Sequence, residues 1–412
     1  MGEKRNFIYG LITGAVLVLI ISIFYFGTDK IVEKVEDNTG TQVVKNGYNS
    51  PGEKIDDILK YVDNMFYIED YKKEDFYDSM YEDILNKLED PYTTYYTPDE
   101  FKDVMEDTSG SYEGIGAVVS YIKETEEIMI LSPFIGSPAE KAGLLPGDII
   151  KKVDNQEIKG LSLEEVVAKK IKGKKGTKVV LTVYREVDNT NSMIDIEITR
   201  DIITVPTVSH EMLDDKIGYI RVTGFEKVTF KQFKEALTDL EKQNQQGLII
   251  DLRNNPGGLL DIVIKMADEL LPKGLIVYTE DKNGDRRVAN SDEKHKFTKP
   301  LVVLVNENSA SASEILSGAI KDSGIGTIVG TTTFGKGLVQ TIVPLEDGSA
   351  MKVTISKYFT PSGNYIHKKG ITPDVEVELP EELQKYLVVE REKDNQFAKA
   401  VEVMKEKLKN LE

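Results

Sequence analysis

Residues 301–340 read LVVLVNENSASASEILSGAIKDSGIGTIVGTTTFGKGLVQ, and this stretch organises the rest of the chain. Its first five residues are an apolar run that predicts a buried strand. From Ala312 onward, apolar residues recur at spacings of three and four, which predicts a helix with one face on a core. The serines between strand and helix therefore lie at a helix N-terminus, where free N–H groups stabilise negative charge. A hydroxyl in this place can attack a carbonyl while those N–H groups bind the oxyanion.

The same serines also fit a purely structural role. Ser311 and Glu314 have the spacing of a capping box, and Ser309 is a second possible cap. The end of the stretch favours chemistry, because Lys336 lies between two glycines and Gln340 follows on the same side of a predicted strand. A lysine deprotonates a serine only when it is neutral, which requires burial that lowers its pKa. The alternative for Lys336 is an exposed lysine in a glycine turn.

The two motifs SASASEI (residues 309–315) and TFGKGLVQ (residues 333–340) together resemble those of the C-terminal processing peptidases, or tail-specific proteases. These are Ser-Lys serine proteases that carry a PDZ domain. The resemblance covers nearly all of the chain after about residue 50. It implies that Ser311 is the nucleophile, Lys336 the general base and Gln340 the residue that positions the base.

The segment DLRNNPGG (residues 251–258) resembles the family's motif beside the active site. The resemblance implies that the N–H of Gly257 or Gly258 joins the N–H of Ala312 in the oxyanion hole. Glycine suits this role because it permits the unusual backbone that turns an N–H inward. A plain turn between strand and helix is the alternative. Strands and helices alternate between residues 247 and 330, which predicts crossovers and a partly parallel sheet.

Residues 110–186 are predicted to form the PDZ domain, with a helix at 163–171 and a closing strand at 178–185. The segment YEGIG ahead of a strand resembles the loop that binds a peptide's terminal carboxylate through backbone N–H groups. The candidate residues of this loop are Tyr112, Gly114, Ile115 and Gly116. The alternative is a PDZ fold that braces the protease without binding a terminus.

Residues 7–26 are twenty uncharged, mostly apolar residues, which is long enough for a transmembrane helix. Lys4 and Arg5 precede them, so the positive-inside rule places the N-terminus in the cytoplasm. We expect a single-pass cell-membrane anchor with the catalytic body on the extracytoplasmic side. A cleaved signal peptide is the alternative, but no small-x-small site follows the apolar segment.

The expected fold class is a multidomain α+β or α/β protein with a mixed-sheet protease core. We expect seven parts along the chain. They are a cytoplasmic N-terminus (1–6), a membrane anchor (7–26), a linker (27–52), a helical region (53–109), the PDZ domain (110–186), the protease core (187–380) and a helical tail (381–412). In the family, the region corresponding to the helical part often mediates dimer contacts, so the resemblance implies a homodimer.

Composition excludes several other functions. The 412 residues carry a net charge of −18, which argues against nucleic acid as a partner. There is no cysteine, so disulfides and a thiol nucleophile are excluded. Of the three histidines, His210, His295 and His367, none matches the family's base, and the residues after His210 do not complete a zinc-protease motif. We expect no metal and no cofactor.

The sequence therefore predicts a membrane-anchored serine endopeptidase that captures protein or peptide substrates by accessible C-termini through its PDZ domain and cleaves them with Ser311, Lys336 and Gln340. The alternative is a membrane-tethered PDZ scaffold that binds peptides without cutting them.

Overall fold

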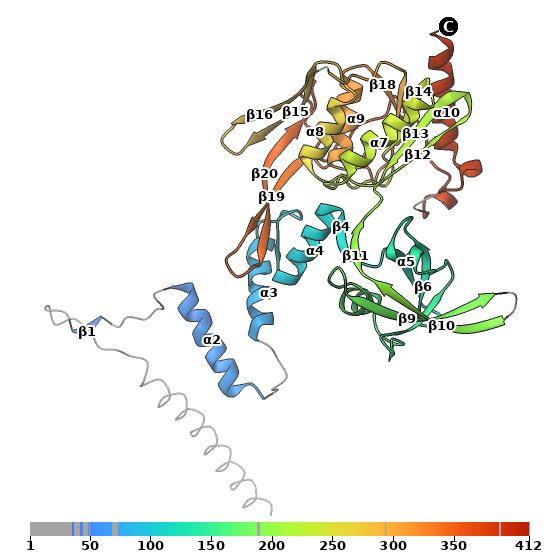
Figure 1. Ribbon diagram of the computed structural model, residues 1–412. Helices are drawn as coiled ribbons and strands as arrows, with labels where there is room; N and C mark the ends of the chain where they lie inside the picture. Colours follow the sequence, from blue (N-terminus) through green and yellow to red (C-terminus); the bar gives the residue numbers. More distant parts are fainter. Residues whose placement is uncertain are drawn as a thin grey trace, which may run out of the picture. The chain divides into compact units, whose positions relative to one another are not determined.

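The structure is a computed structural model that describes residues 35–36, 42–43, 48, 50–67, 73–187, 190–292, 294–386 and 389–411 (Figure 1). The chain divides into two compact units between Tyr77 and Asp78. The predicted anchor, residues 7–26, lies outside the described ranges. Within those ranges, no helix combines the length and the apolar character needed to cross a membrane.

The first unit contains α2 (Pro51–Met65) and a two-residue pairing of β1 (Val35–Glu36) with β2 (Gln42–Val43). Helix α2 begins where it does because Ser50 caps it, accepting a hydrogen bond from the N–H of Glu53, and proline follows at the first helical position. The next helix, α3 (Lys73–Asn86), contains the boundary between the two units.

A short strand interrupts the region that was predicted as helical. Strand β3 (Thr94–Tyr96) pairs with β20 (Ala350–Phe359) of the protease core. Its sequence, TYY, is β-branched and aromatic, which favours an extended backbone over a helix. Helix α4 (Pro98–Ser109) then begins with a complete capping box between Thr97 and Glu100. The strand carries the residues just before α4 to the core.

The PDZ domain is built on a sheet of strand order β10-β9-β7-β6-β5, with β8 paired to β7. The predicted strand after the YEGIG segment, the helix at 163 and the closing strand are all present. The sheet continues to Thr199, past residue 186, because β10 pairs with β9 along its whole length. The elements are β4 (Ser111–Gly114), β5 (Ala117–Ile122), β6 (Glu127–Pro133), α5 (Pro138–Lys141), β7 (Ile149–Val153), β8 (Gln156–Glu157), α6 (Leu163–Val166) with a π-helical turn (Val167–Ile171), β9 (Lys178–Val187) and β10 (Thr190–Thr199).

The protease core contains a six-stranded sheet of order β12-β13-β14-β17-β18-β21. From β13 to β21 all neighbours are parallel, which confirms the predicted crossovers. Helices α7, α8 and α9 cover one face and α10 covers the other (Figure 1). The elements are β12 (Val208–Met212), β13 (Ile217–Val222), α7 (Thr229–Lys242), β14 (Gly247–Asp251), α8 (Leu260–Asp268), β17 (Leu301–Val305), α9 (Ala312–Asp322), β18 (Gly326–Gly330), β21 (Val375–Glu376) and α10 (Asn395–Lys409).

A second sheet completes the core, with strand order β16-β15-β20-β19. It consists of β15 (Gly274–Asp281), β16 (Arg286–Ser291), β19 (Leu338–Pro344) and β20. All pairs in it are antiparallel, and β19 pairs with β20 from Leu338 to Pro344. Two short pieces outside these sheets, β11 (Asp201–Thr204) and β4, pair with each other. Lys336 thus lies in the loop just before β19 and Gln340 lies in β19, while Ser311 follows β17 of the other sheet.

Candidate active site

Ser311 lies between β17 and α9, at the place that the sequence predicts. All five residues of β17 are buried, so the strand is fixed in the core and the chain turns immediately after it. Ser311 has φ +54° and ψ −111°, an unusual backbone conformation for a residue with a side chain. The hydroxyl of Tyr358 donates to its carbonyl at 3.1 Å, and a Cβ on Gly257 would approach its own Cβ to 2.7 Å. The surrounding backbone therefore holds this serine in a strained position.

The other two serines of the cluster are structural. Ser309 is fully buried, donates its hydroxyl to the carbonyl of Leu252 at 2.8 Å and accepts from the N–H of Asn306 at 2.9 Å. Ser313 is also buried, and its hydroxyl donates to the carbonyl of Asn255 at 2.9 Å. These bonds join the turn after β17 to the turn after β14. Only Ser311 of the three is half-exposed.

Glu314 was considered only as part of a helix cap, and the structure gives it a larger role. Its buried carboxylate accepts from the N–H of Ser311 at 2.9 Å, as a capping box requires. It also accepts from the backbone N–H groups of Gly335 and Lys336 at 2.7 and 2.8 Å, and from the hydroxyl of Thr333 at 2.6 Å. The sequence contains one signal of this role, which is a charged residue in the first turn of a largely apolar helix.

The side chain of Lys336 is half-buried, and its ammonium lies 4.7 Å from the ring centre of Tyr92. Burial lowers the pKa of Lys336, and the nearby charge of Lys352 lowers it further. The carboxylates of Asp90 and Glu314 act in the opposite direction but do not cancel the shift. These contacts shift the Lys336 amine in the direction that a general base requires, toward the neutral form.

A cleft of about 390 Å³ brings the predicted residues together. Its lining includes Ser311, Ala312, Lys336, Gln340 and Gly258. The Gln340 amide donates to the hydroxyl of Thr354 at 3.3 Å, so its orientation is set by β20. Among the described residues, no hydrogen bond joins the Lys336 amine to the Ser311 hydroxyl. The groups share one cleft, but the proton-transfer contact is not formed in this state.

The two oxyanion-hole glycines differ in what their N–H groups do. Gly257 is buried and donates to the side-chain oxygen of Asn255 at 2.9 Å. Gly258 is exposed, and within the described chain neither its N–H nor that of Ala312 has a hydrogen-bond partner. Gly258 has φ +146°, and a Cβ there would approach the carbonyl oxygen of Phe225 to 2.6 Å, so only glycine fits. Of the two glycines, Gly258 therefore has the N–H that is available to donate a hydrogen bond to an oxyanion.

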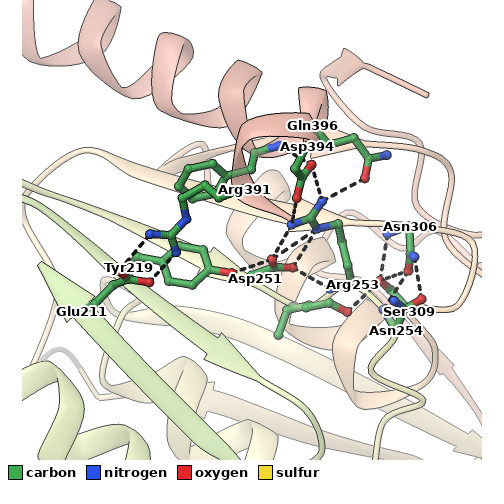
Figure 2. Close-up of polar contacts among 12 residues, drawn as sticks. Glu211, Tyr219, Asp251, Arg253, Asn254, Asn306, Ser309, Arg391, Asp394 and Gln396 are labelled. Atoms are coloured by element: carbon green, nitrogen blue, oxygen red, sulfur yellow. Dashed lines mark hydrogen bonds and ion pairs between the residues drawn. The ribbon is translucent and has the colours of Figure 1, made fainter. Parts of the chain in front are cut away.

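A buried ionic network anchors the turn that leads to these glycines (Figure 2). Arg253 contacts both oxygens of Asp251, with its Nη2 at 2.7 Å from Oδ2, and also reaches Asp394 and Gln396 at the start of α10. Burial alone would raise the pKa of Asp251, but the charge and hydrogen bonds of Arg253 lower it below its usual value. The hydroxyl of Tyr219 donates to Asp251 at 2.8 Å. Sequence reasoning missed Asp394 and Gln396, because they lie in the charged tail.

Amide side chains continue this network toward the serine (Figure 2). The backbone N–H of Asn254 donates to the Asn306 side-chain oxygen at 2.9 Å, and the Asn306 amide donates back to Asn254 at 2.8 Å. Asn308 donates to the same oxygen of Asn254 at 3.0 Å. The turns that carry the glycines and Ser311 are therefore locked to one another.

The predicted carboxylate-binding loop of the PDZ domain lies between β4 and β5. Gly114, Ile115 and Gly116 are buried, and the Ile115 side chain belongs to the PDZ core. The carbonyls of Ile115 and Gly116 accept from Ala139 and Phe134, both at 2.9 Å. The N–H groups of Ile115 and Gly116 have no hydrogen-bond partner among the described residues. Tyr112 is half-buried, under the ammonium of Lys172 at 5.2 Å from its ring centre.

The histidines do not form a catalytic triad in the described part of the chain. His210 contacts Asp239 at 3.0 Å near the surface, and His295 is exposed. His367 lies behind the base, where a Cβ on Gly337 would approach its backbone nitrogen to 2.7 Å. Burial lowers the pKa of His367. In the described ranges, no group of histidine and acidic residues could hold a metal ion.

Comparison with known proteins identifies the families of the protease core and of the PDZ domain. Residues 216–377 match peptidase family S41, and residues 131–185 match the PDZ domain. The carboxy-terminal processing protease CtpA of Bacillus subtilis is 41% identical over 383 residues, covering 92% of this chain and 78% of that protein. A protein described as a CtpA-like serine protease of Staphylococcus saprophyticus is 37% identical, covering 89% of this chain and 73% of its own. A solved S41 protease structure from Bacteroides fragilis has the same fold, with a TM-score of 0.52 at 16% identity, covering 87% of this chain and 99% of that one.

Proposed function

The chain belongs to peptidase family S41 and is a serine-type endopeptidase of the C-terminal processing kind, and from this premise we propose that Ser311, Lys336 and Gln340 perform the cleavage. The observation that carries the proposal is the shared cleft, which is lined by a strained serine, a lysine with a lowered pKa and two N–H groups that have no hydrogen-bond partner among the described residues. A scaffold that only bound peptides would have no need of this combination.

In the proposed reaction the Ser311 oxygen bonds to the scissile carbonyl carbon while its proton passes to the neutral amine of Lys336. Because the two groups are not hydrogen-bonded in the described state, we expect substrate binding to bring them into contact. The negative charge that forms on the carbonyl oxygen is met by the N–H groups of Ala312 and Gly258. The C–N bond then breaks, and Lys336 returns its proton to the leaving amine. Water hydrolyses the acyl-enzyme, with Lys336 again accepting the proton.

The role of Gln340 follows from its place on β19. Its side chain lines the cleft with Lys336, and the hydrogen bond to Thr354 leaves its oxygen available to accept from an amine. A neutral amide can orient the lysine without adding a charge that would raise its pKa. We therefore assign Gln340 to positioning the base.

Substrate capture is proposed for the PDZ domain. The N–H groups of Ile115 and Gly116 lie in a glycine loop and are free in the described chain, which suits a terminal carboxylate. Tyr112 and Gly114 would shape this loop. The test compares cleavage of one peptide with a free and with an amidated C-terminus. If the PDZ domain captures the C-terminus, the peptide with the free C-terminus is cleaved clearly faster. Equal cleavage rates would mean that the domain supports the protease core without binding a terminus.

The remaining proposals concern placement. We propose that residues 7–26 anchor the chain in the cell membrane, with residues 27–52 as the linker and the folded domains outside the cytoplasm. The same proposal includes a helical region at 53–109, a PDZ domain that begins at 110 and extends to Thr199 with β10, a protease core up to 380, a tail at 381–412 and a homodimer through the helical region. Resistance of the body to a protease added to intact cells would contradict the orientation.

Cleavage itself is tested with the full-length chain in detergent and fluorescein-labelled casein. We expect turnover by the wild type and none by Ser311→Ala or Lys336→Ala. His367→Ala is the matched control, because this histidine lies beside the base loop but does not line the cleft. Activity that survives Lys336→Ala and disappears in His367→Ala would overturn the assignment of the base.

A further inference from the structure

A second lysine lies in the catalytic cleft. Lys352 is in β20, opposite Ile342 of β19, and it lines the same cleft as Ser311 and Lys336. It is on the same face of β20 as Thr354, which holds the Gln340 amide, because residues two apart in a strand share a face. Its side chain is half-buried. Two lysine side chains, Lys336 and Lys352, therefore share a cleft in which one general base is proposed.

Lys352 is unusual in this acidic chain. The net charge is −18, yet within the described residues Lys352 forms no ion pair, and its ammonium lies 5.4 Å from the ring centre of Tyr96. A surface lysine that contributes only to solubility is expected to extend into water or to form an ion pair with one of the many carboxylates. The face of an aromatic ring instead stabilises the charged form of this lysine.

We propose that Lys352 is an electrostatic positioning residue for the general base, because its positive charge disfavours protonation of Lys336 and so keeps the amine ready to accept the proton of Ser311. This inference rests on the proposed Ser-Lys function. Lys352 does not itself exchange a proton with substrate in this scheme. A like charge near an amine is an established way of keeping the amine neutral, in addition to burial.

The other charged groups around Lys336 make this contribution necessary. Asp90, in the segment before β3, and Glu314, in α9, both attract a proton to the amine. The Glu314 carboxylate accepts four hydrogen bonds, and Asp90 accepts from the Thr93 hydroxyl at 2.7 Å. The ring of Tyr92 also favours the ammonium form. Burial and the charge of Lys352 oppose them, and together they lower the pKa of Lys336.

Further titratable groups line the same cleft from α4, the turn before α7, β3 and β20. They are Asp107, Glu226, Tyr96 and Tyr358, and His367 lies behind the base loop. None of these adds a positive charge to the cleft at neutral pH, since burial lowers the pKa of His367. Lys352 is therefore the cation in the described cleft that can balance the two carboxylates.

The test measures the protonation of Lys336 directly, without relying on proteolysis. The full-length chain is treated with trace acetic anhydride across a pH series, and acetylation of the Lys336 peptide is followed by mass spectrometry. Only the neutral amine reacts, so the midpoint of the profile reports its pKa. Lys352→Gln removes the charge, and Lys352→Arg keeps it. Lys357→Gln is the matched control, because Lys357 is on the same strand, does not line the cleft and lies over Tyr365.

We expect the Lys336 midpoint of Lys352→Gln to move to higher pH by about 0.5 to 1 unit, with Lys352→Arg and Lys357→Gln close to the wild type. The shift should shrink in high salt, since screening weakens the repulsion. In the casein assay, the acid side of the kcat/KM profile should move equally, a three- to tenfold loss at a fixed pH below the midpoint. An unmoved midpoint in Lys352→Gln would overturn the inference.

Two other outcomes separate this inference from its rivals. A loss of kcat/KM that is equal at every pH, with the midpoint unmoved, would mean that Lys352 binds substrate or supports the fold, and would contradict the proposal. A shifted midpoint in a chain that cleaves nothing would retain the electrostatic role of Lys352 and would count against the proposed protease function instead.

Discussion

Ser311 and Lys336 both donate their backbone N–H groups to one oxygen atom, Oε2 of Glu314, at 2.9 and 2.8 Å. The proposed nucleophile and the proposed base lie next to different sheets of the core, and one buried carboxylate binds the backbone of both. The other oxygen of Glu314 binds Gly335 and Thr333, which holds the rest of the base loop. The relative position of the two catalytic groups is thus set by a side chain that touches neither of their reactive atoms.

Glu314→Gln tests this arrangement. The amide replaces one acceptor oxygen by a donor, so buried N–H groups lose their partner, at about 1–3 kcal/mol for each unsatisfied group. We expect kcat/KM to fall at least 100-fold at every pH, together with a lower stability in urea unfolding. The control is Glu307→Gln, since Glu307 is exposed and, within the described part of the chain, accepts a hydrogen bond from the Thr331 hydroxyl alone, at 3.0 Å. Wild-type activity in Glu314→Gln would show that the shared carboxylate is not needed.

Gln340→Glu is expected to change the pH dependence rather than only the rate. A carboxylate beside Lys336 stabilises the ammonium and raises its pKa, so a higher pH is needed to obtain the neutral base. The acid side of the kcat/KM profile should move up by about one unit or more. Gln340→Ala is the comparison, because it removes the positioning contact without adding charge. It should lower the rate, and the acid side of its kcat/KM profile should move less than that of Gln340→Glu. Identical profiles for the two variants would argue against a charge effect.

Tyr92 acts on the same equilibrium in the opposite sense. Its ring stabilises the Lys336 ammonium 4.7 Å away, an interaction of about 0.5–1 kcal/mol. Tyr92→Leu removes this stabilisation, so the pKa of Lys336 should fall and the acid side of the profile should move down by about half a unit. Tyr92→Phe keeps the ring and should stay near the wild type. An upward movement in Tyr92→Leu would contradict the assigned direction.

Arg253→Met is predicted to destabilise the core. The substitution leaves Asp251 buried without its cation, which costs about 3–5 kcal/mol at pH 7. The folded-state pKa of Asp251 is lowered by Arg253, so this stabilisation is present above the ordinary aspartate pKa and is lost as pH falls through the folded value. The difference between variant and wild type in urea unfolding should therefore narrow at low pH.

The control for Arg253→Met is Arg391→Met. Arg391 pairs with Glu211 at a half-exposed site on the same side of the sheet (Figure 2). An exposed ion pair contributes less than about 1 kcal/mol, so this variant should unfold close to the wild type. Equal destabilisation by the two substitutions would show that the buried network contributes no more to the free energy of unfolding than the exposed ion pair does.

Much of the site could be predicted from the sequence because its parts are local. The buried strand, the helix start at Ser311 and the glycines around Lys336 leave clear patterns within 40 residues, and family resemblance supplied their roles. The resemblance left Gly257 and Gly258 as alternatives for the oxyanion hole, and our proposal takes Gly258 because Asn255 already accepts from the N–H of Gly257. That choice depends on one hydrogen bond, which no sequence pattern reveals.

The parts that could not be predicted are contacts between distant segments. Tyr92 reaches Lys336 only because β3 pairs with β20, and the three residues of that strand lie inside a region with a helical pattern. Asp394 reaches Arg253 from a tail whose charges look like those of a solvated helix. In both cases tertiary pairing determines the partner, and local spacing contains no information about it.

The central claim is that Lys336 activates Ser311, and the most direct measurement is covalent labelling of the serine. The full-length chain, Lys336→Met and His367→Ala are treated with a fluorophosphonate across a pH series, and the modified peptide is identified by mass spectrometry. We expect labelling of Ser311 in the wild type and in His367→Ala, with a rate that rises through a midpoint below the ordinary lysine pKa of about 10.4, and a loss of at least 100-fold in Lys336→Met. Equal labelling with and without Lys336, or labelling of Ser309 or Ser313 instead, would contradict it.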